Sequence, residues 1–125
     1  MSSQLSRMLG TLGAEVLETL WDAPRPLTVR EVQERLNRAR PEPLAYTTIM
    51  TVLARLAERD ILVREMNGRA YVYQAVVADA AELAVRDVIR DHGEMAVAHF
   101  VDMYSAELGI RSRLSRLIRD EDAGG

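Results

Sequence analysis

One stretch constrains the fold more than any other, because a pattern typical of an amphipathic helix runs directly into a pattern typical of a hairpin. Apolar residues at helical spacing predict a helix over residues 45–60. Its buried stripe is expected to consist of Ile49, Val52, Leu53 and Leu56. Two β-rich runs follow on either side of Asn67-Gly68, a dipeptide that favours a tight type I′ turn. The sequence therefore predicts a helix followed by a two-stranded hairpin.

Two further helices are predicted upstream of this pair. Apolar residues recur at helical spacing in residues 10–22, and two prolines in the following segment end that helix. Thr28 and Glu31 then form the capping box of a second helix. Three helices followed by a hairpin are the elements of a winged helix-turn-helix. We therefore expect a mainly α fold with a small β-hairpin, in which residues 1–77 form a winged-helix DNA-binding domain.

The face of the third helix opposite its apolar stripe differs from an ordinary solvent-exposed face. It carries three threonines, which lower helix propensity, where Glu, Lys or Gln would be more usual. Short side chains let a helix approach base edges in a major groove about 12 Å wide, and arginines on its flank and on the hairpin would neutralise phosphates. The residues predicted to contact DNA are Tyr46, Thr47, Thr48, Met50, Thr51, Arg55, Arg64 and Arg69.

Each of these residues taken alone also has an ordinary interpretation. Thr47 could cap the helix, Thr48 and Thr51 could be neutral surface, and the arginines could be solvated. The combination of such a helix face with an arginine-bearing hairpin favours DNA binding.

Charge is polarised along the chain, although the net charge is −3. Residues 1–77 carry 10 arginines against 9 acidic residues, whereas residues 78–125 carry 6 against 10. All 16 basic residues are arginines, which make bidentate contacts to phosphate and guanine. A codon bias towards GC-rich DNA explains the same preference, so arginine usage by itself does not decide the function.

Residues 78–125 are predicted to form a helical dimerisation region. Asp79 and Glu82 begin one helix and Gly93 ends it, a second helix is expected to end near Gly109, and a third follows. Such helices have little core of their own, so they must fold back onto the winged helix or pair with a second chain, and we favour a homodimer. The residues expected in the dimer interface are Val97, Val101, Tyr104, Leu108, Leu114, Leu117 and Ile118.

The composition argues against an enzyme and against a metal or cofactor site. The chain has no cysteine, which excludes disulfides, thiolate metal sites and cysteine nucleophiles. His92 and His99 lie in no catalytic or metal-binding motif, and no phosphate-binding glycine loop occurs. No apolar run approaches the roughly 20 residues that span a bilayer, so we expect no membrane insertion and a cytoplasmic location.

Four segments between residues 9 and 77 are more specific than a general helix-turn-helix pattern. They read LGTLGAEVLETLW, TVREVQERL, LAYTTIMTVLARLAERDIL and GRAYVYQAV. These segments resemble the penicillinase repressor family, the BlaI/MecI/CopY type of bacterial regulators. The resemblance implies a homodimeric repressor that binds a palindromic double-stranded DNA operator and controls β-lactamase-related or other stress and resistance genes. The alternative is a protein-interaction module whose winged helix docks another protein without specific DNA binding.

The resemblance also bears on how such a protein would leave DNA. In relatives that respond to β-lactams, a membrane sensor protease leads to cutting of the repressor tail at an Asn-Phe bond. The corresponding bond here is His99-Phe100, with histidine in place of asparagine. The alternative is that Phe100 simply packs in the dimer core. Copper-responsive relatives use cysteines in their tails, so metal sensing of that type is not expected in this chain.

Overall fold

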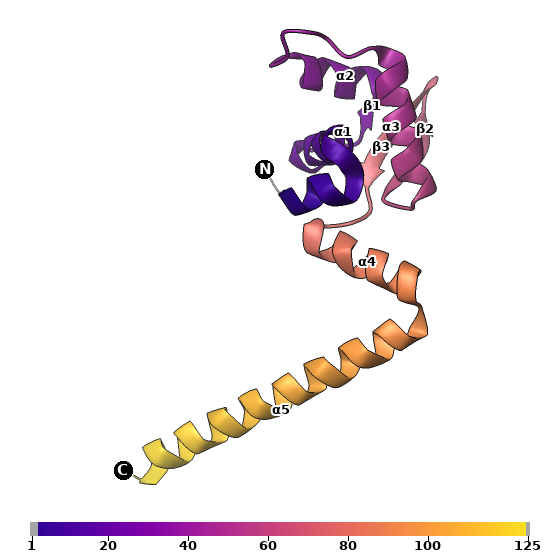
Figure 1. The fold of residues 1–125 in the computed structure, drawn as a ribbon. Coiled ribbons are helices and arrows are strands. Elements are labelled where there is room, and N and C mark those ends of the chain that lie inside the picture. Colours follow the sequence, from indigo (N-terminus) through magenta and orange to yellow (C-terminus); the bar gives the residue numbers. More distant parts are fainter. Residues whose placement is uncertain (1–2, 125) are drawn as a thin grey trace. The chain divides into compact units, whose positions relative to one another are not determined.

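Five helices and three strands follow one another along residues 3–124, which are the residues that the computed structural model describes. The elements are α1 (Ser3–Asp22), β1 (Leu27–Thr28), α2 (Val29–Asn37), α3 (Tyr46–Glu58), β2 (Leu62–Asn67), β3 (Ala70–Ala75), α4 (Ala80–His92) and α5 (Glu94–Gly124) (Figure 1). One compact unit ends at Ala84 and a second begins at Val85. The fold is mainly helical with a small antiparallel sheet, as the sequence predicts.

The predicted hairpin is present, and a third strand extends it. β2 and β3 pair antiparallel with Leu62 opposite Ala75, and we call these two strands and their turn the wing. The short strand β1 pairs with the other edge of β3, which gives the sheet order β1-β3-β2. The expectation of two strands was therefore incomplete, because a strand of two residues is too short to show an alternating pattern.

The turn of the wing differs from the predicted one. Asn67 pairs with Ala70, so the central residues are Gly68 and Arg69, not Asn67 and Gly68. Gly68 has φ 70°, and among the described non-glycine residues only Asp60 has a positive φ. A positive φ at the first central residue alone is the requirement of a type II′ turn, so the type I′ prediction is wrong. Arg69 consequently lies at the tip of the wing.

The core lies between α1, α2, α3 and one face of the sheet. Ile49, Leu53 and Leu56 are buried as predicted, and Val52 is half-buried. The other large side chains that are fully buried are Leu5, Val16, Leu17, Leu27, Val32, Ile61, Val77 and Leu83. Leu83, in the first turn of α4, belongs to this cluster, which explains why the first compact unit continues beyond residue 77.

Two glycines with positive φ interrupt the helices, one within α1 and one between α4 and α5. Gly10 divides α1 into two helical segments with φ 77° and ψ 164°, a conformation that side chains with a Cβ rarely adopt. Gly93, at φ 67°, separates α4 from α5 as predicted, and its N–H donates to the Ile89 carbonyl oxygen at 2.7 Å.

The tail contains two helices where three were predicted. α4 begins with the expected capping pair, since the Glu82 N–H donates to Asp79 Oδ1 at 2.9 Å. α5 continues without a break through Gly109, so the helix end expected there is wrong. Gly109 has no positive φ, and one glycine costs a helix only about 1 kcal/mol, which a long helix tolerates. Within residues 3–124, none of the helices combines the length and apolarity required to cross a membrane.

Candidate nucleic-acid interface

The outer face of α3 is the surface on which most of the predicted DNA-contacting residues gather. Tyr46 and Met50 are 44% and 43% exposed although both are large and partly apolar. The other exposed members of this face are Thr47, Thr48, Thr51 and Arg55. The opposite face of α3 is buried in the core. This packing holds the helix in place with its outer face exposed.

Side-chain hydrogen bonds from α2 to Leu44 hold the connector between α2 and α3 and so fix where α3 begins. The Leu44 N–H donates to Asn37 Oδ1 at 2.8 Å, and Asn37 Nδ2 donates to the Leu44 carbonyl oxygen at 3.1 Å. Gln33 Nε2 donates to the same oxygen at 3.1 Å. Polar side chains late in a helix carry no specific signal in a sequence, so the prediction missed these positioning residues.

The hydroxyl groups of α3 are not used to cap the helix. The N-cap residue is Ala45, which makes no side-chain hydrogen bond to the first turn, so Thr47 does not have the capping role that it could have had. Thr51 donates instead to the Thr47 carbonyl oxygen at 2.9 Å. Neither the Thr47 hydroxyl nor the Thr51 hydroxyl caps an end of α3.

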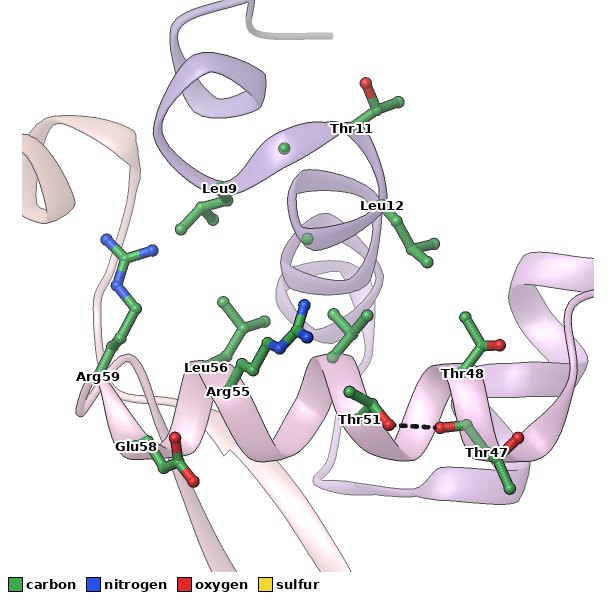
Figure 2. A pocket seen from close by; sticks show the side chains of 13 residues that line it. Leu9, Thr11, Leu12, Thr47, Thr48, Thr51, Arg55, Leu56, Glu58 and Arg59 are labelled. Atoms are coloured by element: carbon green, nitrogen blue, oxygen red, sulfur yellow. Dashed lines mark hydrogen bonds between the residues drawn. The ribbon is translucent and has the colours of Figure 1, made fainter.

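A groove of about 790 Å³ runs along α3 beside the Gly10 bend of α1 (Figure 2). Its apolar lining comes from Leu9, Leu12, Val52 and Leu56. In Figure 2, Arg55 and Arg59 extend from α3 towards the side of α1, whereas Glu58 points away. The segment that forms the far wall, residues 9–13, was not predicted to contribute to this surface. Gly10 was the only signal in the sequence that could have indicated a bend there.

The wing carries the two remaining arginines in different settings. The Arg64 guanidinium carbon lies 4.5 Å from the centroid of the Tyr71 ring, within the range of a cation–π contact. Arg69 is exposed at the turn. The structure thus places all eight predicted residues on α3 or the wing.

The predicted dimerisation residues lie along α5 and are exposed in the single chain. They are Val97, Val101, Tyr104, Leu108, Leu117 and Ile118; the side chain of Leu114 lies outside the described residues. A helix turns by about 100° per residue, so Leu117, nine residues after Leu108, projects from about the opposite side of α5. Two apolar stripes result on different sides of one helix, the first formed by Val97, Val101, Tyr104 and Leu108 and the second by Leu117 and Ile118.

The histidines of the tail make no site of their own. His99 is exposed, and its neighbour Phe100 stacks on Tyr104 with ring centroids 6.1 Å apart. Among the residues that the structure describes, no three His, Asp or Glu side chains gather as metal ligands would.

Comparison with known proteins identifies the family. The sequence profile described as penicillinase repressor matches residues 9–119. The chain belongs to the penicillinase repressor family. The match extends well past the four segments that carry the resemblance and includes most of the tail. Proteins named transcriptional regulator BlaI, from two strains of Mycobacterium tuberculosis, are 36% identical over 124 residues, which cover 93% of this chain and 86% of the relative.

Membership of the penicillinase repressor family decides the class of protein. The chain is a transcriptional regulator of the BlaI type that binds DNA, and it is not an enzyme. Solved structures with similar folds include the PcaV transcriptional regulator of Streptomyces coelicolor, 20% identical, with a TM-score of 0.48 over 84% of this chain and 82% of that one. MepR of Staphylococcus aureus is 16% identical, with a TM-score of 0.40 over 94% of this chain and 80% of that one.

Proposed function

We propose that this regulator is a homodimeric repressor that binds a palindromic operator through α3. The observation that carries the proposal is the outer face of α3, where short hydroxylated and apolar side chains are exposed on a helix whose other face is buried. Such a face can approach base edges and thymine methyl groups closely. Arg55 on its flank, with Arg64 and Arg69 on the wing, would contact phosphates.

The homodimer is proposed from the tail. Residues 78–125 form the dimerisation region in this proposal, and residues 1–77 hold the DNA-binding elements. The exposed apolar side chains of α5 gain from a partner chain that covers them. A two-fold dimer would then present two copies of α3 to two half-sites spaced by about one helical turn of DNA or a multiple of it.

The regulated genes are proposed to be β-lactamase-related or other stress and resistance genes. Support comes from the family description, which names penicillinase, and from relatives named BlaI. A membrane sensor protease system is proposed as the upstream partner, on the basis of the family resemblance alone.

A footprint of the full chain on the DNA upstream of its own gene, repeated at several salt concentrations, tests the proposal. We expect one protected region with two-fold symmetry, and binding that weakens steeply with salt because arginine contacts release counterions from DNA. Failure to protect any such region would contradict operator binding. A protein-interaction module would instead bind its partner through a mainly apolar surface, with little dependence on salt.

A further inference from the structure

The core-facing side of the wing continues outward as an exposed surface. Residues directly opposite in the pairing of β2 and β3 point to the same face, and alternate residues of a strand share that face. Arg64 lies opposite Tyr73, and Met66 lies opposite Tyr71. At the base of this face Leu62 and Tyr73 are each 3% exposed, whereas Met66 and Tyr71, farther out, are 58% and 43% exposed. We call Arg64, Met66 and Tyr71 the wing ledge.

The guanidinium of Arg64 is oriented by the ring of Tyr71. Its central carbon lies over the ring, 4.5 Å from the ring centroid, which is the distance of a cation–π contact. The ring contacts one side of the guanidinium, and the N–H groups on its other sides stay available as donors. No carboxylate among the described residues pairs with Arg64. The cation is therefore held by an aromatic face and keeps its charge available for a ligand.

The acidic neighbour of the ledge lies on the other side of the wing. Glu65 pairs with Val72, and strand alternation places both on the opposite face from Arg64. The ledge consequently combines two apolar side chains with one cation and no anion. An aromatic ring and a thioether beside an unneutralised guanidinium match a deoxyribose and its phosphate better than they match an apolar protein surface.

We infer that the wing ledge binds the sugar–phosphate backbone of the operator, and that Tyr71 is a positioning residue that aims Arg64 at a phosphate. This inference rests on the proposed function, because it requires that the chain bind an operator. Holding the guanidinium in one orientation before binding reduces the side-chain freedom that is lost when the phosphate contact forms. Arg69, at the turn, has no such ring contact among the described residues and offers a matched comparison.

A double-mutant cycle on the full chain tests the coupling between the two residues. Dissociation constants for a fluorescent operator duplex would be measured for Tyr71→Leu and Tyr71→Phe, each with and without Arg64→Ala. We expect Tyr71→Phe, which keeps the ring face, to bind as the unchanged protein does. Tyr71→Leu should weaken binding about three- to tenfold alone, but less than about twofold when Arg64 is already absent.

Arg69→Ala is the control arm of the cycle. It should weaken binding to any duplex and lower the salt slope by about one charge, as Arg64→Ala also should. Tyr71→Leu should keep its full effect in the Arg69→Ala background, because Tyr71 holds Arg64 and not Arg69. In the free protein, NMR should show that Tyr71→Leu removes the ring-current shift of the Arg64 side-chain protons, whereas Tyr71→Phe retains it.

Three results would overturn the inference. The first is an equal effect of Tyr71→Leu with and without Arg64. The second is an unchanged operator affinity of Tyr71→Leu. The third is that Tyr71→Leu binds DNA normally but self-associates differently in sedimentation, which would show that the wing ledge contacts a second copy of the chain. Urea unfolding identifies a variant that fails to fold, and Tyr71→Thr then replaces Tyr71→Leu. Failure of the unchanged protein to bind the duplex would instead contradict the proposed function.

Discussion

The Thr51 hydroxyl donates a hydrogen bond to the backbone carbonyl oxygen of Thr47, 2.9 Å away and one turn earlier in α3. A hydroxyl has one proton, so this bond leaves Thr51 with an oxygen acceptor and a methyl group and no donor for a ligand. In a major groove, that combination suits the thymine methyl group and the amino donors of adenine and cytosine.

Thr51→Glu is expected to abolish the preference for the operator over an unrelated duplex, because the longer side chain would hold α3 away from the bases and the phosphates would repel its carboxylate. Thr51→Val keeps the methyl group and the shape of the side chain but loses the acceptor, so it should reduce the preference by about tenfold at most. Competition binding with operator and unrelated duplexes measures both effects, and circular dichroism checks the fold. Normal operator preference in a folded Thr51→Glu protein would remove this face of α3 from the interface.

Leu108→Asp is expected to shift the chain from dimer to monomer, because it places a charge within the apolar stripe of α5. Operator affinity should fall with it, since two linked half-site contacts gain from a high effective concentration. Arg116→Asp is the control, because Arg116 is exposed and lies between the two stripes, about 80° around the helix from Leu108 and about 100° from Leu117. Sedimentation at several protein concentrations measures the shift. A dimeric Leu108→Asp chain would contradict the proposed role of this stripe.

Acid should weaken the winged-helix unit through Glu31. The hydrogen bond from Arg25 and the backbone N–H of Thr28 lower the pKa of the Glu31 carboxyl from its ordinary value of 4.5 to about 2. Because the folded pKa lies below the unfolded one, the stabilisation is present above pH 4.5 and is lost as the pH falls towards 2. Arg25 is largely exposed, so solvent screening keeps the contribution to stability smaller than the pKa shift alone suggests.

Glu31→Gln isolates this contribution, since glutamine keeps the capping-box geometry without the charge. The variant should lose part of the pH dependence of the unfolding free energy between pH 4.5 and 2. Urea unfolding at a series of pH values measures it. An identical pH profile in the two proteins would show that Glu31 does not contribute.

Derepression, if proteolytic, is expected to cut the chain between Gly93 and Gly109, with His99-Phe100 as the candidate bond. Both residues are exposed, but they lie inside α5, so the helix must open locally before a protease can bind the strand. A cut there would separate the stripes of α5 from the winged helix and lower operator affinity without altering α3. Mass spectrometry of the protein from induced and uninduced cells tests this. An intact chain during full derepression would favour a ligand or a competing partner.

Features that depend on neighbours in the sequence were predicted well. The capping box forms as expected, with the Thr28 hydroxyl accepting from the Glu31 N–H at 3.1 Å. Three of the four residues predicted for the buried stripe of α3 are buried and Val52 is half-buried, and the helix break at Gly93 was correct. Each of these depends on residues within one or two turns of each other, so spacing and residue type are sufficient to determine them.

Tertiary structure decided the features that join distant segments. Strand β1 forms because it pairs with the edge of β3. Leu83 is buried because it packs against the core of the first unit. The helix predicted to end at Gly109 continues, because a single glycine lowers helix stability by less than the rest of the helix provides.

The interface itself shows the same division between sequence and structure. The sequence determined which side chains α3 and the wing present, since helical and strand periodicity assign each residue to a face. It could not place Tyr71 under Arg64, set the groove between α3 and the Gly10 bend, or make Asn37 hold Leu44. Those relationships depend on strand register and on the packing of helices, which form only when apolar side chains from several elements are buried together.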